Sequence, residues 1–565
     1  MIPLLYARPR RSRNLRTLLL SGILLVSALL AVSQAQITLD GSLGPRGPLA
    51  GPIYRIGAEL RQIRGGNLFH SFGEFSVPTG GSATFSGPNT IANILGRVTG
   101  GQPSFIDGLL RSEITGANLF LLNPSGIMFG PNASLDVSGS FHVSTADFLR
   151  LADGATFSAH LGQASALTVA APAAFRFLGS ELPSITIEGS SLQVPVGSVL
   201  SVVGGDITMV GGRISSGRLL LAGMASPGEV VLNPSASAID SFAYGSRIAL
   251  SQGALISTSS TSDGSVGDVV VRGERVTLTN GAQIVSSNSG VGRGGDVTII
   301  ATDTITIAGR NSGLFTNTRG RGPGGHLQVR ARTIELRDGG TIAARSSGEG
   351  DAGMIRLQAG ETFRSQNGTV TTTSNHAGGG AITLTAGRLV QLLDSELSTS
   401  VRGGGGDAGN ITIKSAFLVL AGSQVIADAF GGMGGNTLLF GTEVFLVDQM
   451  SGVSASSTLG IGGFAPPLSG ALIPLPQTFM SVAALLPVRC AARASGGRHS
   501  SLVLGGRDGL PDGPSGVLAS PLVLEERLVA DPAMIGGPPR PSSTPQWALL
   551  AGHEKRLPRL GCPQG

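Results

Sequence analysis

The 565-residue sequence is poor in aromatic residues, which make up only 4% of the chain. It contains one tryptophan, Trp547, and three tyrosines, Tyr6, Tyr54 and Tyr244. Sites that cleave polysaccharides combine paired carboxylates with aromatic platforms that hold the sugar. The shortage of rings argues against such a site, and we expect the protein not to be an enzyme.

Lysine is almost absent: of the 40 basic residues, only Lys414 and Lys555 are lysines. Charged residues make up 13% of the chain, and the net charge is +5. Beyond the N-terminus the arginines are scattered and are not interleaved with aromatic residues, whereas nucleic-acid sites gather basic side chains on one face. We therefore expect no nucleic-acid partner.

Cysteine is nearly missing as well, and the two copies are Cys490 and Cys562. In an oxidising compartment they could pair and close the last part of the chain, or they could be two free thiols; the sequence leaves both possibilities open. The seven histidines show no ligand spacing with one another or with cysteine. We expect no metal site and no cofactor.

Long apolar runs are limited to one, from Thr17 to Val32. Five arginines and no acid precede this run, and Ser33-Gln34-Ala35 follows it with small residues where a signal peptidase cuts. The pattern predicts a secretory signal peptide over residues 1–35, cleaved between Ala35 and Gln36. A membrane anchor is the alternative, although the run falls just short of the usual membrane span.

Glycine, by contrast, is abundant, with 87 copies, and some of them recur at a regular interval. A glycine, a variable residue and an alternating apolar strand repeat with spacings of 28, 30, 28, 27, 29 and 26 residues. Neither a heptad nor a propeller blade has this period, and disordered chains hold less Val, Ile and Leu. The glycines of the repeat are Gly267, Gly295, Gly325, Gly353, Gly380, Gly409 and Gly435.

Each repeat contains three short alternating strands, as in Val297–Ile299, Ile305–Ile307 and Leu314–Phe315. Alternation sends every second side chain inward, where equivalent positions of successive coils stack. Glycine is expected at the sharp corners, often with positive φ. The sequence therefore predicts an all-β fold, a right-handed parallel β-helix with three sides. A β-sandwich is disfavoured because it has no superperiod of this length. Roughly 17 coils between residues 40 and 450 would form a rod of about 80 Å.

Aspartates such as Asp206, Asp268 and Asp296 recur at one repeat position beside a glycine. We interpret them as Asx-type corner residues, because catalysis would not require the same acid in every coil. Parallel β-helices do also host polysaccharide lyases and hydrolases. A secreted polysaccharide-active enzyme is therefore the alternative function.

An ordered series of short motifs runs from Ile37 to about Gly154. The motifs are Ile37-Thr-Leu-Asp-Gly-Ser, Asn67-Leu-Phe-His-Ser-Phe72, Ile91-Ala-Asn-Ile-Leu-Gly-Arg-Val-Thr99, Ile106-Asp-Gly108, Asn118-Leu-Phe-Leu-Leu-Asn-Pro-Ser-Gly-Ile-Met-Phe-Gly130 and Ala133-Ser-Leu-Asp-Val-Ser-Gly-Ser-Phe141. In this order they resemble the N-terminal secretion domain of filamentous haemagglutinin-like exoproteins of two-partner secretion systems. The segment around Asn123 is similar to the family's Asn-Pro-Asn-Gly-Ile motif, with Ser125 in place of the second asparagine.

The resemblance implies a secreted or surface-exposed, adhesin-like structural protein of a Gram-negative-type bacterium. It implies passage through the periplasm and then through a partner outer-membrane β-barrel transporter with periplasmic domains. It also implies a host, cell-surface or matrix ligand, which the sequence does not identify. The residues that it assigns to secretion and partner recognition are Asn118, Leu119, Phe120, Asn123, Pro124, Ser125, Gly126 and Ile127.

Four parts are expected along the chain. They are the signal peptide at 1–35, a capped secretion domain at 36–154, a β-helical shaft at 155–450 and a less regular, proline-rich tail at 451–565. The tail segments around Leu475 and Leu486 resemble the C-terminal module of shorter members of the same family. Because no series of amphipathic ten-residue strands follows Ser451, a separate barrel is expected to carry out export.

The signal-peptide prediction can be tested on exported protein. Mass spectrometry should find Gln36, or the pyroglutamate formed from it, at the N-terminus, because signal peptidase cuts after the small residue at Ala35. An intact Met1 in a membrane fraction would contradict the prediction.

Overall fold

The structure is a computed structural model that describes residues 36–232, 245–260, 264–466 and 473–474. The proposed signal peptide, including Ala35, lies outside these residues, and so do Cys490 and Cys562. The described residues form strands and one short 3-10 helix, η1 (Ala58–Leu60). In this part of the chain no helix is long and apolar enough to cross a membrane.

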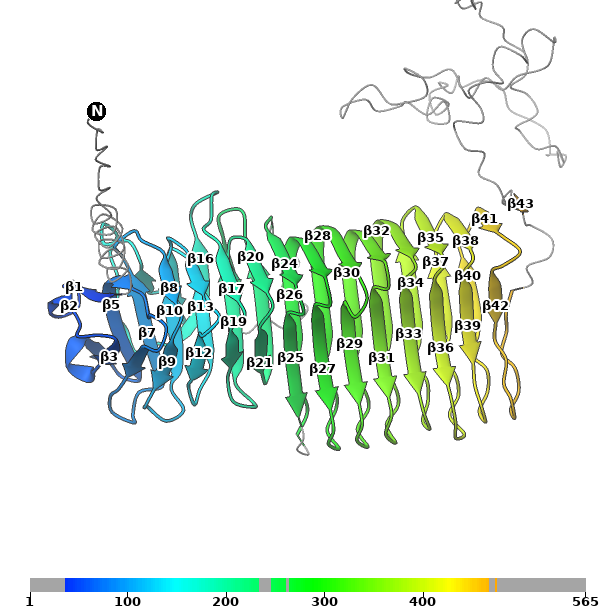
Figure 1. The fold of residues 1–565 in the computed structure, drawn as a ribbon, viewed down its shortest axis with the longest axis horizontal. Coiled ribbons are helices and arrows are strands. Elements are labelled where there is room, and N and C mark those ends of the chain that lie inside the picture. Colours follow the sequence, from blue (N-terminus) through cyan, green and yellow to red (C-terminus); the bar gives the residue numbers. More distant parts are fainter. Residues whose placement is uncertain (1–35, 233–244, 261–263, 467–472, 475–565) are drawn as a thin grey trace, which may run out of the picture. The chain divides into compact units, whose positions relative to one another are not determined.

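Parallel strands stack into a three-sided solenoid, whose successive coils can be followed by colour in Figure 1. We call its sides faces 1, 2 and 3. Face 1 is formed by β5 (Asn67–Phe75), β7 (Asn93–Val98), β10 (Asn118–Leu122), β13 (Phe141–Ser144), β19 (Val199–Gly204), β22 (Arg218–Gly223), the first halves of β26 (Val269–Thr279), β28 (Val297–Ala308), β30 (Leu327–Arg337) and β32 (Ile355–Gln366), and then β34 (Ile382–Ala386), β37 (Ile411–Lys414) and β40 (Thr437–Phe440).

The other two faces are built in the same way. Face 2 is formed by β8 (Ser104–Ile106), β11 (Ile127–Phe129), β17 (Ile185–Glu188), β20 (Ile207–Val210), β24 (Arg247–Ser251), the second halves of β26, β28, β30 and β32, and then β35 (Leu389–Leu393), β38 (Phe417–Ala421), β41 (Val444–Val447) and β43 (Ile473–Pro474). Face 3 is formed by β3 (Ile53–Ile56), β6 (Ser82–Phe85), β9 (Leu109–Ser112), β12 (Ser134–Asp136), β18 (Ser191–Gln193), β21 (Arg213–Ser216), β25 (Leu255–Ser260), β27 (Gln283–Asn288), β29 (Gly313–Thr318), β31 (Thr341–Ser346), β33 (Thr369–Ser374), β36 (Glu396–Val401), β39 (Gln424–Asp428) and β42 (Gly452–Ser454). The predicted parallel β-helix with three sides is thus confirmed.

The number of coils is lower than the sequence suggested. Face 3 has 14 strands, one per coil, instead of the roughly 17 coils expected. The expectation spread residues 40–450 evenly over coils, whereas the segment 145–182 and the segment around β23 (Gly228–Val231) leave the solenoid. Together the two segments form a 4-stranded antiparallel sheet. Its strands are β14 (Phe148–Leu151), β15 (Thr156–Ser158) and β16 (Pro172–Phe177) of the first segment and β23 of the second. At about 4.8 Å per coil, the rod is roughly 65 Å long.

The interior is filled by stacked apolar side chains, mostly aliphatic, from the inward positions of all three faces. On face 2, for example, one buried row contains Ile207, Ile248, Val276, Ile305, Ile334, Phe363, Val390 and Leu418. Each member is paired in register with the next. Neighbouring side chains of the row, most of them β-branched, therefore pack against each other across adjacent strands. The alternation read from the sequence therefore gives the inside of the solenoid directly.

The repeat glycines serve a purpose other than the expected one. None of Gly295, Gly325 and Gly353 has a positive φ. A β-carbon on Gly325 would lie 1.9 Å from the carbonyl oxygen of Gly295, and one on Gly353 would lie 1.8 Å from that of Gly325. The expectation of positive φ at this corner was wrong, because what excludes a side chain is the backbone of the preceding coil. Positive φ occurs instead between faces 2 and 3, at residues such as Asn280 and Asn367.

The repeated acids cap the backbone of the next coil. Asp268 Oδ1 accepts a hydrogen bond from the Asp296 amide (3.0 Å), and Asp296 Oδ1 accepts one from the His326 amide (2.7 Å). His326 Nδ1 accepts in turn from the Met354 amide (3.0 Å). The acids are therefore corner residues whose bonds to backbone amides cross from one coil to the next, and Asp296 also pairs with Arg293 of its own turn (2.8 Å). Asp206 caps Arg247, Asp351 caps Gly378, Asp407 caps Met433 and Asn410 caps Asn436.

Antiparallel strands cover the N-terminal edge of face 1. The strand β1 (Ile37–Asp40) pairs with β2 (Arg46–Pro48) and β5, and β4 (Gln62–Arg64) also pairs with β5. The Ser76 amide donates to the Gln36 carbonyl (3.1 Å). Sheet edges left open invite pairing with other chains, so this arrangement protects the end of the stack.

The last described corner explains where the regular coils end. Gly463 repeats the glycine stacking, since its β-carbon would lie 2.3 Å from the Gly435 carbonyl oxygen. The Thr437 amide donates to the Phe464 carbonyl (2.8 Å), as it would in a further coil. Ala465 and Pro466 then occupy the place of the next strand, and proline has no amide hydrogen to donate to a strand ladder.

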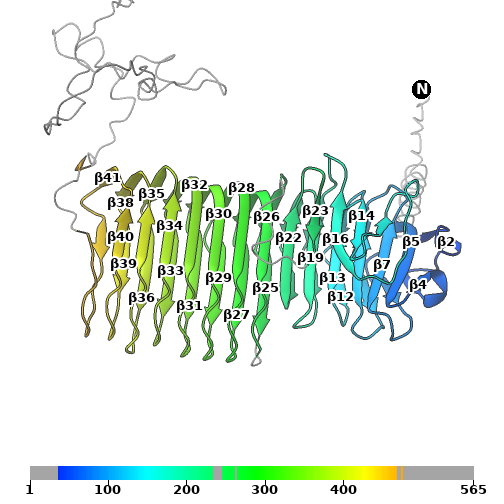
Figure 2. The same cartoon turned by 180° about the vertical axis from the view of Figure 1, so that it is seen from behind.

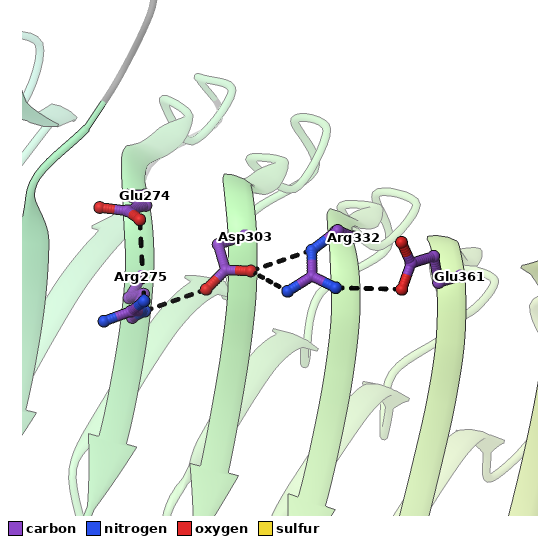
Figure 3. A network of polar contacts seen from close by, with 5 residues as sticks. All are labelled: Glu274, Arg275, Asp303, Arg332 and Glu361. Atoms are coloured by element: carbon purple, nitrogen blue, oxygen red, sulfur yellow. Dashed lines mark hydrogen bonds and ion pairs between the residues drawn. The ribbon is translucent and has the colours of Figure 1, made fainter. Parts of the chain in front are cut away.

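An exposed ladder of charges follows the corner between faces 1 and 2, as Figure 3 shows. Arg275 Nε donates to Asp303 (2.9 Å), Arg332 Nε donates to the same carboxylate (3.0 Å), and Arg332 also reaches Glu361 (3.0 Å). The hydrogen bonds from Arg275 and then Arg332 hold the pKa of Asp303 below its usual range. Exposed ion pairs contribute little to stability, so the ladder neutralises the corner more than it holds the coils together.

The glycine corner generates a stability prediction. Gly353→Ala should lower the free energy of unfolding of the purified mature protein by about 3 kcal/mol, because the new methyl group overlaps the Gly325 carbonyl. Gly360→Ala is the matched control. Its β-carbon would meet nothing closer than 3.5 Å, so its effect should stay within about 0.5 kcal/mol. Chemical unfolding followed by circular dichroism measures both, and equal effects would show that stacking at the corner is not the constraint.

Candidate secretion-signal region

Asn123 fixes the corner between β10 and β11, and its side chain is fully buried. Its Nδ2 donates to the Gln102 carbonyl (2.9 Å) and to Ser104 Oγ (2.9 Å) of the preceding coil. Its Oδ1 accepts from the Ser125 amide (2.9 Å), which closes the turn over Pro124. One amide side chain thus satisfies donors and acceptors of two coils at once.

Gly126 completes the same turn with a φ of +112°, a conformation that other residues adopt only with strain. Its amide donates to the Asn123 carbonyl (3.2 Å), and its carbonyl accepts from the Ser104 amide (3.0 Å). Ile127 begins β11, and its amide donates to the Ser184 carbonyl (3.2 Å). The corner is therefore held from both sides, by the coil before it and by the coil after it.

Asn118 belongs to an asparagine ladder at the start of face 1. Its Nδ2 donates to Asn93 Oδ1 (3.0 Å), and Asn93 Nδ2 donates to Asn67 Oδ1 (2.9 Å). Asn67 ends the ladder by donating to the carbonyls of Thr168 (3.0 Å) and Ala170 (2.7 Å). The ladder thus connects three coils to the segment that leaves the solenoid.

Leu119 and Phe120 point to opposite sides of face 1. Leu119 lies in the interior of the solenoid, whereas Phe120 is buried on its outer side. The Phe120 ring stacks on His142 with a centroid distance of 4.3 Å, and His142 Nδ1 lies 2.7 Å from Ser201 Oγ. The residues singled out by the resemblance therefore do not form one cluster. Asn123 to Ile127 form a corner, and Asn118 to Phe120 lie on the strand that leads to it.

A second hydrophobic core lies under the antiparallel sheet, whose strands β14, β16 and β23 are labelled in Figure 2. Outward-facing residues of face 1 form one side of this core, and the antiparallel sheet forms the other. Exposed on a bare solenoid, they would make a continuous apolar stripe, which soluble surfaces avoid. The buried members are Phe69, Leu95, Phe120, Leu122, Ala146, Leu149, Leu151, Phe157, Phe175, Phe177, Val203, Leu220, Ala222, Met224, Val230, Leu232 and Val270.

Arg97 of β7 joins this core to the first residues of the described chain. Its Nε donates to Ser71 Oγ (2.7 Å), and its guanidinium also reaches Ser42 Oγ (3.0 Å) and Ser165 Oγ (2.8 Å). It donates further to the Ser158 carbonyl. The guanidinium is buried, so each of these bonds replaces water that it has lost.

The buried cation has a carboxylate nearby that completes the network. Asp40 accepts from Ser71 Oγ (2.5 Å) and Thr99 Oγ1 (2.8 Å), and from both the amide and hydroxyl of Ser42. Burial alone would raise the pKa of Asp40, but the hydrogen bonds outweigh it and bring that pKa below its usual range. Burial lowers the pKa of Arg97, and the charge of Asp40 partly offsets this. Strand β1, face 1 and the antiparallel sheet are thereby interlocked.

Asp107 plays a similar capping role on the far side of the same coils. It accepts a hydrogen bond from Thr79 Oγ1 and two from Asn132, through its amide (2.9 Å) and its Nδ2 (3.0 Å). A β-carbon on Gly130 would lie 2.3 Å from the Asp107 carboxylate, so the glycine makes room for it.

Two signals in the sequence could have revealed these networks. Arg97 interrupts an apolar strand, in Ile94-Leu-Gly-Arg-Val98, and a charge at such a place needs buried partners. Asp40 and Asp107 both stand within the motifs that carry the resemblance. The partners of Arg97 and Asp40 lie as far as 68 and 59 positions away in the chain, so no local pattern identifies them.

His70 is buried in the aromatic core of the first coils. Its ring stacks on Phe72 (5.9 Å) and packs edge-on against Phe85 (5.5 Å), and neither ring nitrogen has a hydrogen-bond partner. Burial, with the nearby charge of Arg61, lowers the pKa of His70 to about 3, and burial lowers that of His142 to about 3 as well. Both rings are therefore neutral in the folded protein at neutral pH.

Within the described ranges, no three His, Cys, Asp or Glu side chains come together as a metal site would require. The candidate acids of the enzymatic alternative, Asp268 and Asp296, are engaged in capping backbone amides, as described above.

The buried histidines generate a prediction about pH. An unfolded chain protonates histidine near pH 6.5, whereas folded His70 resists protonation until about pH 3, so stability is full above pH 6.5 and falls as the pH drops below it. At pH 5 each buried histidine lowers the free energy of unfolding by roughly 2 kcal/mol relative to its value above pH 6.5. The loss between pH 7 and pH 5 should shrink by about this amount in His70→Leu, measured by urea unfolding. An unchanged loss would mean that His70 takes up a proton in the folded state.

Residues 35–299, slightly under half of the chain, match the family model of the TPS secretion domain. This segment runs past residue 154, through the antiparallel sheet and into β28, while the domain boundaries at 154 and 450 remain predictions. Comparison with curated proteins gave no match. Among solved structures, the chain is similar to the crystal structure of the HMW1 secretion domain from Haemophilus influenzae, at 15% identity and a TM-score of 0.40, covering 71% of this chain and 96% of that chain.

The family assignment rests on the sequence match. The matched segment contains the asparagine corner, the buried Arg97 network and the antiparallel sheet, and it agrees with the resemblance read from the motifs. The chain therefore carries, in residues 35–299, the N-terminal TPS secretion domain of a two-partner secretion exoprotein.

Proposed function

We propose that this protein is exported through a partner outer-membrane β-barrel transporter with periplasmic domains, and that it acts outside the cell or on its surface as an adhesin-like structural protein. The match of residues 35–299 to the TPS secretion domain carries this proposal. The shaft supports it, because a rod of repeated coils offers a long outer surface for binding. No enzymatic activity and no cofactor are part of the proposal.

Folding from the N-terminus would drive export. From β26 onward, corner carbonyls accept hydrogen bonds from the next coil, and at several corners a carboxylate does so as well, as Asp268 does for Asp296. A coil that emerges outside the membrane therefore finds a ready template and buries its aliphatic row at once. Backward sliding would break these contacts, so directionality needs no nucleotide hydrolysis.

The first coils would serve as the nucleus of this process. They hold the aromatic core of Phe72, Phe75 and Phe85 together with His70, whereas later coils bury mainly aliphatic residues. The Arg97 network and the asparagine ladder add bonds between segments that are distant in sequence. We infer that the secretion domain folds as a unit before the shaft.

Asn123 to Ile127 would set the structure that the transporter engages. The corner spans three coils through Ser104, Asn123 and Ser184, so losing the Asn123 amide would loosen all three. Removing the side chain leaves the Gln102 carbonyl and Ser104 hydroxyl without their donor and costs about 2–3 kcal/mol. Asn118, Leu119 and Phe120 would act by placing this corner, and Pro124 and Ser125 by shaping its exposed turn.

Export of variants tests the proposal in a host that co-produces the cognate barrel. Asn123→Ala should leave signal cleavage intact and leave protein in the periplasm, with a several-fold drop in the external fraction. Asn410→Ala is the matched control, because Asn410 caps the Asn436 amide (2.8 Å) at a shaft corner outside the secretion domain. Its export should match that of the parent.

Two outcomes would count against the proposal. Equal export of Asn123→Ala and the parent would remove Asn123 from the secretion signal. Normal export after deletion of residues 36–154 would show that the chain does not use the two-partner route.

A further inference from the structure

A polar pocket of about 470 Å³ lies on face 3, across the three coils that contain β27, β29 and β31. This volume is in the range of small-molecule sites. Its lining includes Gln283, Arg310, Asn311, Phe315, Asn317 and Arg345. The pocket belongs to the shaft and lies outside the family's secretion motifs.

An irregularity of the repeat creates the rim of the pocket. Thr279, Ala308 and Arg337 are in register at the end of face 2, and Gln283, Gly313 and Thr341 are in register at the start of face 3. The middle coil therefore has four corner residues, 309–312, where the coils before and after it have three, 280–282 and 338–340. The longer corner carries Arg310 and Asn311, and Asn311 has a φ of +65°.

The floor of the pocket is a phenylalanine held in place on both sides. The Phe315 ring lies beside Gly313, where a β-carbon would come within 2.7 Å of it. The Arg345 guanidinium lies 5.5 Å from the centre of the ring, within the range of a cation–π contact. Gln283 Nε2 donates to the Asn311 carbonyl (3.0 Å), so the rim is tied to the preceding coil.

The pocket has positive charge without a counter-charge. None of the lining residues is acidic, and within the described residues neither Arg310 nor Arg345 makes an ion pair. Some exposed arginines of the same coils are neutralised instead, since Arg321 pairs with Glu349 (3.0 Å) and Arg275 with Asp303 (2.9 Å). Two unpaired guanidinium groups beside three amide side chains form a setting for an anion that also carries hydroxyls.

We propose that this pocket binds an acidic saccharide. The guanidinium groups of Arg310 and Arg345 would take its anionic group, because their planar donors match the oxygens of a carboxylate or sulfate. The amides of Gln283 and Asn317 would bond its hydroxyls. A uronic acid and a sulfated sugar share this chemistry. The inference extends the proposed function by giving the exported shaft a ligand class.

Titration calorimetry on the purified mature protein tests the pocket. Methyl glucuronide and glucose 6-sulfate are the acidic probes, methyl glucoside is the neutral probe, and inorganic sulfate is the ion alone. At least one acidic probe should bind about tenfold or more tightly than methyl glucoside. The stronger of the two identifies the acidic group.

Substitutions locate the binding. Arg345→Gln and Arg310→Gln should each raise the dissociation constant about tenfold. Arg364→Gln, at an exposed position of β32 on face 2, should leave it unchanged. Circular dichroism shows whether the variants keep the parent fold.

The proposal is overturned if neither acidic probe binds, if methyl glucoside binds as tightly as they do, or if both pocket variants bind like the parent. If inorganic sulfate binds as tightly as the acidic sugars, the pocket is an anion site and not a saccharide site, which also overturns the proposal. Export is measured separately. Normal export without sugar binding refutes only the pocket, and sugar binding without partner-dependent export refutes only the proposed route.

Discussion

The contact between successive backbones at the glycine corner is the constraint on which the rest of the solenoid depends. A coil can follow the previous one at about 4.8 Å only if nothing projects between them there. The carbonyl of Gly325 lies 1.8 Å from where a β-carbon of Gly353 would stand, and Gly380 and Gly409 repeat the relation. Once these corners are fixed, the strands of all three faces fall into register, and their aliphatic rows stack.

The secretion domain uses stronger and less regular contacts than the shaft. Its coils are joined by an asparagine ladder, by the buried Arg97 and by a second core beneath the antiparallel sheet. Such contacts link residues far apart in sequence, so they form together or not at all. A domain that has to be recognised first and then fold first gains from this cooperativity, whereas the shaft can add one coil at a time.

The outward positions of the shaft are free of these requirements and differ from coil to coil. At one corner, Arg275, Asp303, Arg332 and Glu361 alternate in sign and neutralise one another (Figure 3). At the next corner, one additional residue brings Arg310 to a pocket that contains no acid. Variation of this kind lets a uniform scaffold carry a local binding site, because the inner rows and the glycine corners stay unchanged.

The sequence by itself determined the solenoid, since its alternation and 28-residue glycine repeat depend only on neighbours along the chain and on the coil period. The resemblance read from its motifs also singled out Asn123 and Gly126. The sequence did not determine the coil number, the antiparallel sheet or the partners of Arg97, and it assigned the wrong reason to the repeat glycines. Those features were decided by tertiary structure, because Phe120, Arg97 and Gly353 acquire their surroundings only when distant segments are stacked. Local pattern fixes which side of a strand a residue faces, but only packing decides what lies on that side.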